Sequence, residues 1–90
     1  MILQERIGLL SRLGQYIQAN SPEWEVAKER AYRENQWFVP EFIEKASQQI
    51  AEQFLDEQKV LAWANRYQIP ASSEAPKQVG IVMAGNIPLV

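Results

Sequence analysis

The sequence has no cysteine and no histidine among its 90 residues. Without cysteine these residues can form neither a disulfide bond nor a thiolate nucleophile, and without histidine they lack the most common general base. The most common zinc ligands are missing as well, so we expect no metal site. Because the absence of cysteine fits a reducing compartment, we expect a cytoplasmic protein.

The sequence also has little net charge and no long apolar run. The chain has nine lysine and arginine residues, spread singly, and a net charge of −2, which disfavours binding to nucleic acid or anionic membranes. No apolar run approaches the roughly 20 residues that span a bilayer, and the first residues are too charged for a signal peptide. We therefore expect neither nucleic acid nor a membrane as partner. The length fits one small domain or part of a larger one.

Apolar residues recur at helical spacing through the first 67 residues and predict about four helices. Asn20 is suited to a left-handed helix end, and Ser21 to an N-cap. Asp56 is suited to cap the fourth helix, whereas Val39 offers no side-chain acceptor before Pro40. The predicted helices cover residues 2–19, residues 22–33, a segment that begins at residue 40, and residues 57–67.

We expect the apolar face of each helix to be buried and most aromatic residues to lie in the core. The acidic residues, including neighbours such as Glu41 and Glu44, are expected on solvated faces. Glu29 and Arg33 are spaced for an ion pair on the second helix. The predicted buried residues, helix by helix, are Leu3, Ile7, Leu10 and Ile17 with Leu9, Leu13 and Tyr16; Trp24, Ala27 and Ala31; Ile43, Ala46, Ile50 and Phe54 with Phe42, Ala51 and Leu55; and Val60, Leu61, Ala64 and Tyr67.

The composition changes after the helical region, residues 1–67. Residues 68–77 contain two prolines and two serines and are expected to form a linker to a last segment, residues 78–90. Residues 79–84 form a near-continuous apolar run, which is typical of a strand buried on both faces. Because such a strand needs neighbours, we expect these residues to begin a longer protein that supplies the rest of the sheet.

A turn at Gly85 and Asn86 follows the predicted strand. Taken alone, Asn86 is expected to support this turn through local hydrogen bonds. Gly80 and Gly85 do not form a phosphate-binding loop, because neither of the two glycine-rich nucleotide motifs occurs.

Three segments of the chain carry a family resemblance. VGIVMAGNIPLV (Val79–Val90), NQWFVPEFIEKA (Asn35–Ala46) and LAWANRY (Leu61–Tyr67) resemble the start of the bacterial acyl-CoA reductases, relatives of the luminescence fatty-acid reductase in the aldehyde dehydrogenase superfamily. The resemblance implies that the helices precede the first strand of an α/β aldehyde-dehydrogenase-like nucleotide-binding domain. It also implies an enzyme that reduces a fatty acyl-CoA to an aldehyde with NADPH or NADH, and it allows a homo-oligomer. The family has a threonine-like cap where this chain has Val39.

The same resemblance assigns roles to four residues. Asn86 matches the asparagine whose amide donates a hydrogen bond to the oxyanion formed during acyl transfer and reduction. Met83, Ala84 and Gly85 would bring their backbone near the nicotinamide, and Gly85 stands where the superfamily often has tryptophan. The catalytic cysteine of the family is not among these residues, so this segment alone is not expected to be active.

A second interpretation belongs to another class of protein. The chain would then be a small, free-standing helical interaction module. Its apolar segment, residues 79–90, would add a strand to the edge of a partner's sheet. The absence of cysteine and histidine is consistent with this interpretation too.

Overall fold

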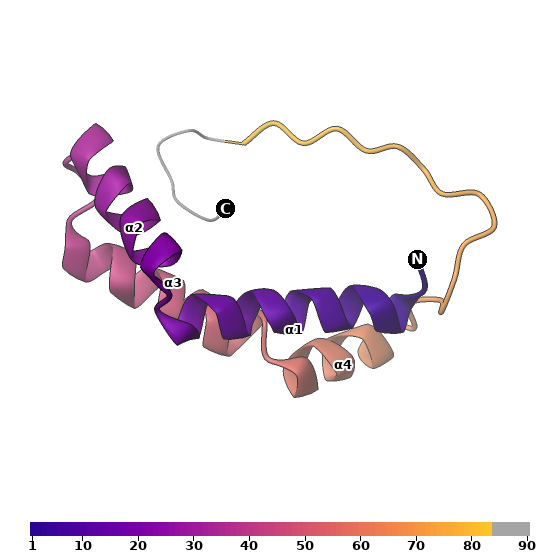
Figure 1. Ribbon diagram of the computed structural model, residues 1–90. Coiled ribbons are helices and arrows are strands. Elements are labelled where there is room, and N and C mark those ends of the chain that lie inside the picture. The colour runs from indigo at the N-terminus through magenta and orange to yellow at the C-terminus, as the bar shows by residue number, and fades with distance from the viewer. Residues whose placement is uncertain (84–90) are drawn as a thin grey trace.

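The computed structural model describes residues 1–83, which form four helices and no β-strand (Figure 1). The expected helical region is thereby confirmed. The helices are α1 (Leu3–Ala19), α2 (Pro22–Glu34), α3 (Pro40–Phe54) and α4 (Glu57–Arg66).

Local sequence signals determine most of the helix ends, as predicted. Asn20 ends α1 in the left-handed conformation, with φ 52° and ψ 47°. The Ser21 hydroxyl accepts a hydrogen bond from the Trp24 N–H at 3.4 Å, and Asp56 accepts one from the Lys59 N–H at 3.1 Å. Each bond provides a partner for a backbone donor that the first turn of a helix leaves free.

The end of α4 has a feature that the sequence did not predict. Gln68 adopts a left-handed conformation with φ 52°, although it is not glycine or asparagine. Its N–H donates to the Asn65 carbonyl at 3.2 Å, and the Ile69 N–H donates to the Ala64 carbonyl at 3.1 Å. This pair of bonds is a Schellman motif. It turns the chain back toward the start of α1.

The helix α1 forms the long side of the molecule. It packs on α3 and α4, and α2 packs on α3 (Figure 1). The core contains Ile17, Ala51 and Leu55, with Trp24 and Ile50 packed against it. The two longest helices therefore make the main contact of the fold.

Small residues allow α1 and α3 to approach closely. A Cβ atom added to Gly14 would lie 2.9 Å from the Leu55 Cβ atom, a distance that side chains essentially never show. Ser47, which faces the same interior, is 1% exposed, and its hydroxyl donates to the Ile43 carbonyl at 2.8 Å. The close approach leaves no room for a large ring between the two helices.

This packing corrects the predicted core. Along α3 and its C-cap, Ile43, Ala51 and Leu55 are buried as predicted, and Ser47 completes the buried row. Ala46 and Ile50, predicted to lie in the centre of the buried face, are only partly buried, and Phe54 is exposed. In α2 the buried residue is Lys28, and Ala27 is exposed. The prediction that the aromatic residues form the core is wrong for most of them. Residues predicted to be buried or in the core but found exposed are Leu9, Leu10, Leu13, Tyr16, Phe42, Phe54, Trp63 and Tyr67.

The segment after α4 leaves the helices. The Ala71 carbonyl accepts a hydrogen bond from the Leu3 N–H at 2.7 Å, and the following residues to 83 are exposed (Figure 1). The predicted strand thus has no sheet partner within residues 1–83 and stays a prediction. No helix in this part of the chain is long and apolar enough to cross a membrane.

Candidate functional site

The residues to which the resemblance assigns chemistry lie at the end of the described chain. Met83 is part of the exposed segment, and 55% of its surface is accessible. Ala84, Gly85 and Asn86 lie outside the described residues. The structure therefore tests neither the nicotinamide contacts nor the oxyanion donor.

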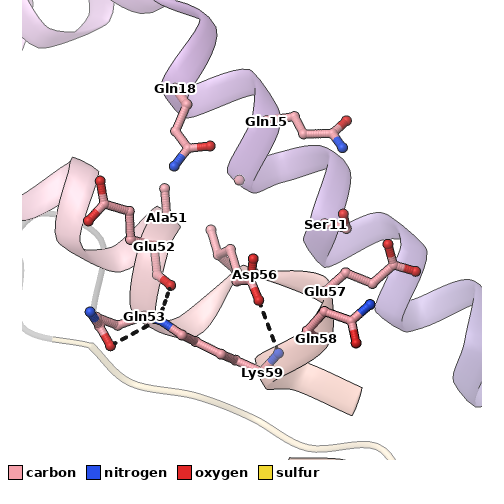
Figure 2. A pocket seen from close by; sticks show the side chains of 12 residues that line it. Ser11, Gln15, Gln18, Ala51, Glu52, Gln53, Asp56, Glu57, Gln58 and Lys59 are labelled. Carbon is pink, nitrogen blue, oxygen red and sulfur yellow. Dashed lines mark hydrogen bonds between the residues drawn. The ribbon is translucent and has the colours of Figure 1, made fainter. Parts of the chain in front are cut away.

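The helical region contains a polar cleft between α1 and the junction of α3 with α4 (Figure 2). Its volume is about 600 Å³. Glutamine amides and acidic side chains form its rim, and the floor is made of small or apolar residues. We name it the amide cleft; it is lined by Ser11, Gly14, Gln15, Gln18, Ala51, Glu52, Gln53, Leu55, Asp56, Glu57, Gln58 and Lys59.

Two of the charged groups of the amide cleft, Lys59 and Asp56, already have partners. The Lys59 ammonium donates to the Glu52 carbonyl at 2.9 Å and to Gln53 Oε1 at 3.4 Å, and the Asp56 carboxylate caps α4 (Figure 2). The amides of Gln15 and Gln18 extend from α1 at the cleft, as Figure 2 shows. Since each amide can both donate and accept, the rim is suited to hydrogen bonding with a polar ligand.

The amide cleft does not have the composition of a catalytic centre. Among residues 1–83 no three acidic side chains gather in a way that could hold a metal ion. The whole chain supplies no histidine or cysteine. The titratable side chains that line the cleft are Glu52, Asp56, Glu57 and Lys59. All four are exposed to solvent, so none has the buried environment that marks one member of an acid–base pair. The described residues of the cleft therefore offer hydrogen bonds and charged contacts to a ligand.

A second polar cluster surrounds Lys28, which is 9% exposed and joins α2 to its neighbours. Its ammonium is bonded to Glu25 at 2.8 Å, to Glu44 of α3, and to Asn20 Oδ1 at 3.2 Å. It also lies 5.9 Å from the Trp24 ring centroid, within reach of a cation–π contact. These contacts hold α2 against α3 and the α1–α2 turn.

The electrostatics of this cluster favour the charged pair. Burial acts to lower the pKa of Lys28, but the hydrogen bonds and charges of Glu25 and Glu44 outweigh it and raise that pKa above its ordinary value of 10.5. The hydrogen bond from Lys28 lowers the pKa of Glu44 below its ordinary value of 4.5. Both groups stay charged at neutral pH. We therefore assign the cluster a structural role: it holds α2 against α3 and against the α1–α2 turn.

The predicted positions of the acidic residues are only partly right. Glu25 and Glu44 are 55% and 44% exposed, in line with the expected solvated face, but both also bond to Lys28, which was not predicted. The predicted pair of Glu29 with Arg33 does not form within the described chain, where Arg30 bonds to Glu34 at 2.8 Å. The sequence offered one signal for the cluster. Lys28 follows Trp24 by four residues, so a helix places this lysine on the same, mainly apolar face as Trp24.

Neither the amide cleft nor the Lys28 cluster was predicted as a site. The glutamines of the cleft come from two distant parts of the chain and resemble ordinary solvated residues until α1 packs on α3. Comparison with known proteins adds no relative. The chain matches no protein family, no curated protein and no solved structure.

Proposed function

We propose that the chain is the N-terminal segment of an acyl-CoA reductase, which converts a fatty acyl-CoA to an aldehyde with NADPH or NADH. The proposal rests on the family resemblance of residues 35–46, 61–67 and 79–90. One observation from the structure supports it. The apolar side chains of Val79, Ile81 and Val82 are 78%, 77% and 103% exposed. Leaving so much apolar surface in water is unfavourable. A sheet would cover these side chains and pair their backbone.

In this proposal the four helices are a scaffold or binding surface. The chemistry needs a cysteine thiolate to take the acyl group, and these 90 residues contain none. The thiolate would come from polypeptide beyond these residues. Asn86 would contribute a hydrogen bond to the oxyanion.

The described residues do not by themselves form a nicotinamide site. Met83, the one residue of the proposed cofactor contacts that is described, is exposed. We therefore assign no step of hydride transfer to this part of the chain. In the proposal the backbone of residues 83–85 meets the cofactor only when the sheet is complete.

The test is oxidation of reduced nicotinamide that depends on a fatty acyl-CoA, measured with the native protein from the cell that makes it. If Asn86 donates to the oxyanion, Asn86→Ala lowers turnover by about 10²–10³ and leaves the unfolding temperature nearly unchanged. Asn65→Ala, on the exposed side of α4, is the matched control and keeps full turnover. Absence of acyl-CoA-dependent oxidation would contradict the proposal. So would an Asn86→Ala variant that loses stability but keeps turnover.

A helical interaction module is the second candidate, and the same exposed segment favours it. Its apolar residues could add a strand to the sheet edge of a partner instead of to their own domain. The intact mass of the native protein separates the two candidates. A mass several times the 10.4 kDa of this chain supports the reductase, and a mass of 10.4 kDa supports the module.

A further inference from the structure

Aromatic and aliphatic side chains gather on one outer face of the helical region. Leu10 of α1, Phe54 of α3, and Val60 and Trp63 of α4 line a single hollow of about 410 Å³. The Tyr67 ring continues the same surface, with its centroid 5.4 Å from that of Trp63. We name these five residues the aromatic patch. Contributions from three helices make it one continuous surface.

The aromatic patch is too exposed to be part of the core. Phe54, Trp63 and Tyr67 are 71%, 57% and 62% exposed. If each ring offers about 200 Å² when free, the three together present roughly 400 Å² of apolar area to water. Leu10, which is 40% exposed, adds to this area. Monomeric proteins rarely expose a continuous apolar patch above a few hundred Å².

We propose that the aromatic patch is the surface through which two copies of this chain pair about a two-fold axis. A standard interface covers about 800 Å² of each partner, of which about 60% is apolar. The exposed rings and Leu10 come close to that apolar share. The interface would therefore be of ordinary size with the patch at its centre and polar residues around it.

The rim of the aromatic patch suits pairing with an identical surface. Its polar lining residues are Gln53 and Lys59, which bond to each other at 3.4 Å. The rim thus has no concentration of like charge. The net charge of the whole chain is only −2, so two copies repel each other weakly. In a two-fold interface each residue of the patch contributes from both copies. Buried aromatic residues, here Phe54, Trp63 and Tyr67, contribute most of the binding energy of such interfaces. The inference does not depend on the proposed enzymatic function.

Sedimentation velocity of the 90-residue chain tests the inference. Between about 1 and 100 μM, a range that brackets the weak end expected for an interface of this size, the species should shift from 10.4 kDa to twice that mass. Trp63→Glu and Phe54→Glu each place two charges in the interface and should raise the dimer Kd at least about tenfold.

The control is a substitution with the same chemistry at a different place. Trp37 lies in the α2–α3 connection, is 91% exposed and does not line the hollow. Trp37→Glu should leave the dimer Kd unchanged. Far-UV circular dichroism checks that each variant keeps its helices. A wild-type chain that stays at 10.4 kDa up to the highest concentration would overturn the inference. The aromatic patch would then be covered by another part of a larger protein. A dimer that Trp37→Glu weakens as much as Trp63→Glu would also overturn it.

Discussion

Gly14 lies where α1 and α3 come closest. A side chain there would meet the Leu55 Cβ atom at 2.9 Å and the Leu55 carbonyl oxygen at 3.1 Å. Both atoms are fixed by the backbone at the C-cap of α3, so they cannot move away by a change of rotamer. Gly8 lies on the same helix, and an added Cβ atom there would have no neighbour within 4 Å. The two glycines therefore differ in packing while sharing the same helical conformation.

This difference gives a paired prediction. Gly8→Ala should stabilise the protein by about 0.5–1 kcal/mol, because alanine favours the helix and restricts the unfolded chain. Gly14→Ala gains the same propensity but overpacks the interface, so it should destabilise the protein by about 1–3 kcal/mol. Urea unfolding followed by tryptophan fluorescence measures both changes. Equal effects of the two substitutions would show that α1 and α3 do not pack as closely as described.

At the scale of elements, α4 depends on its ends. It has 10 residues, and isolated helices shorter than about 12–15 residues are marginal in water. Asp56 caps its start, and the Schellman motif at Gln68 ends it. The turn leads to the hydrogen bond between Leu3 and Ala71, which fastens the end of the helical region to the start of α1. A change at either end should therefore affect global stability.

The two left-handed residues found among residues 1–83 respond differently to glycine. Gln68 pays a steric cost at φ 52°, so Gln68→Gly should raise stability by about 0.5–1 kcal/mol. Asn20 tolerates this conformation better, and its side chain accepts a hydrogen bond from Lys28 at 3.2 Å. Asn20→Gly should therefore bring no gain or a loss. Thermal unfolding compares the two variants, and a gain at Asn20 as large as at Gln68 would contradict this account.

The sequence predicts the helices better than their faces because the two depend on different interactions. Capping and proline signals act within a few residues, so Asn20, Ser21 and Asp56 could be recognised in advance. The buried row of α3 depends on what lies opposite. Leu55 and Ala51 face inward because Gly14 lets α1 approach them, and Phe54, one position before Leu55, is then left outside. Apolarity alone ranks Phe54 above Ala51 and so gives the wrong face.

The sites were harder to predict than the fold. The amide cleft exists only where Gln15 and Gln18 of α1 meet Gln53 and Gln58, which no local pattern connects. Lys28 resembles a solvent-exposed residue of a polar helix until Glu44 of α3 is placed beside it. By contrast, the role of Asn86 follows from resemblance alone and lies beyond the described residues.

At the scale of the whole molecule, the Lys28 cluster determines how α2 responds to pH. The folded pKa of Glu44 is below 4.5, so below that pH the unfolded chain takes up a proton before the folded chain does. Stability from this group is present above pH 4.5 and is lost as the pH falls through the folded pKa. The folded pKa of Lys28 is above 10.5, so its contribution is present below that pH and is lost as the pH rises through the folded pKa. The cluster therefore contributes a constant amount near neutral pH.

We expect Lys28→Met to reduce this acid sensitivity, because Glu44 then loses the partner that lowers its pKa. Glu44 is 44% exposed, so solvent screening keeps the difference below about 1 kcal/mol. The measurement is the urea midpoint at pH 7 and pH 4 for both proteins, at a salt concentration that screens exposed pairs. Arg30→Met is the matched control. It removes one positive charge from an exposed pair with Glu34. Because the salt screens the effect of Arg30 on the pKa of Glu34, the variant should keep the acid response of the wild type. If Lys28→Met keeps that response as well, Glu44 does not hold α2 to α3 through its charge.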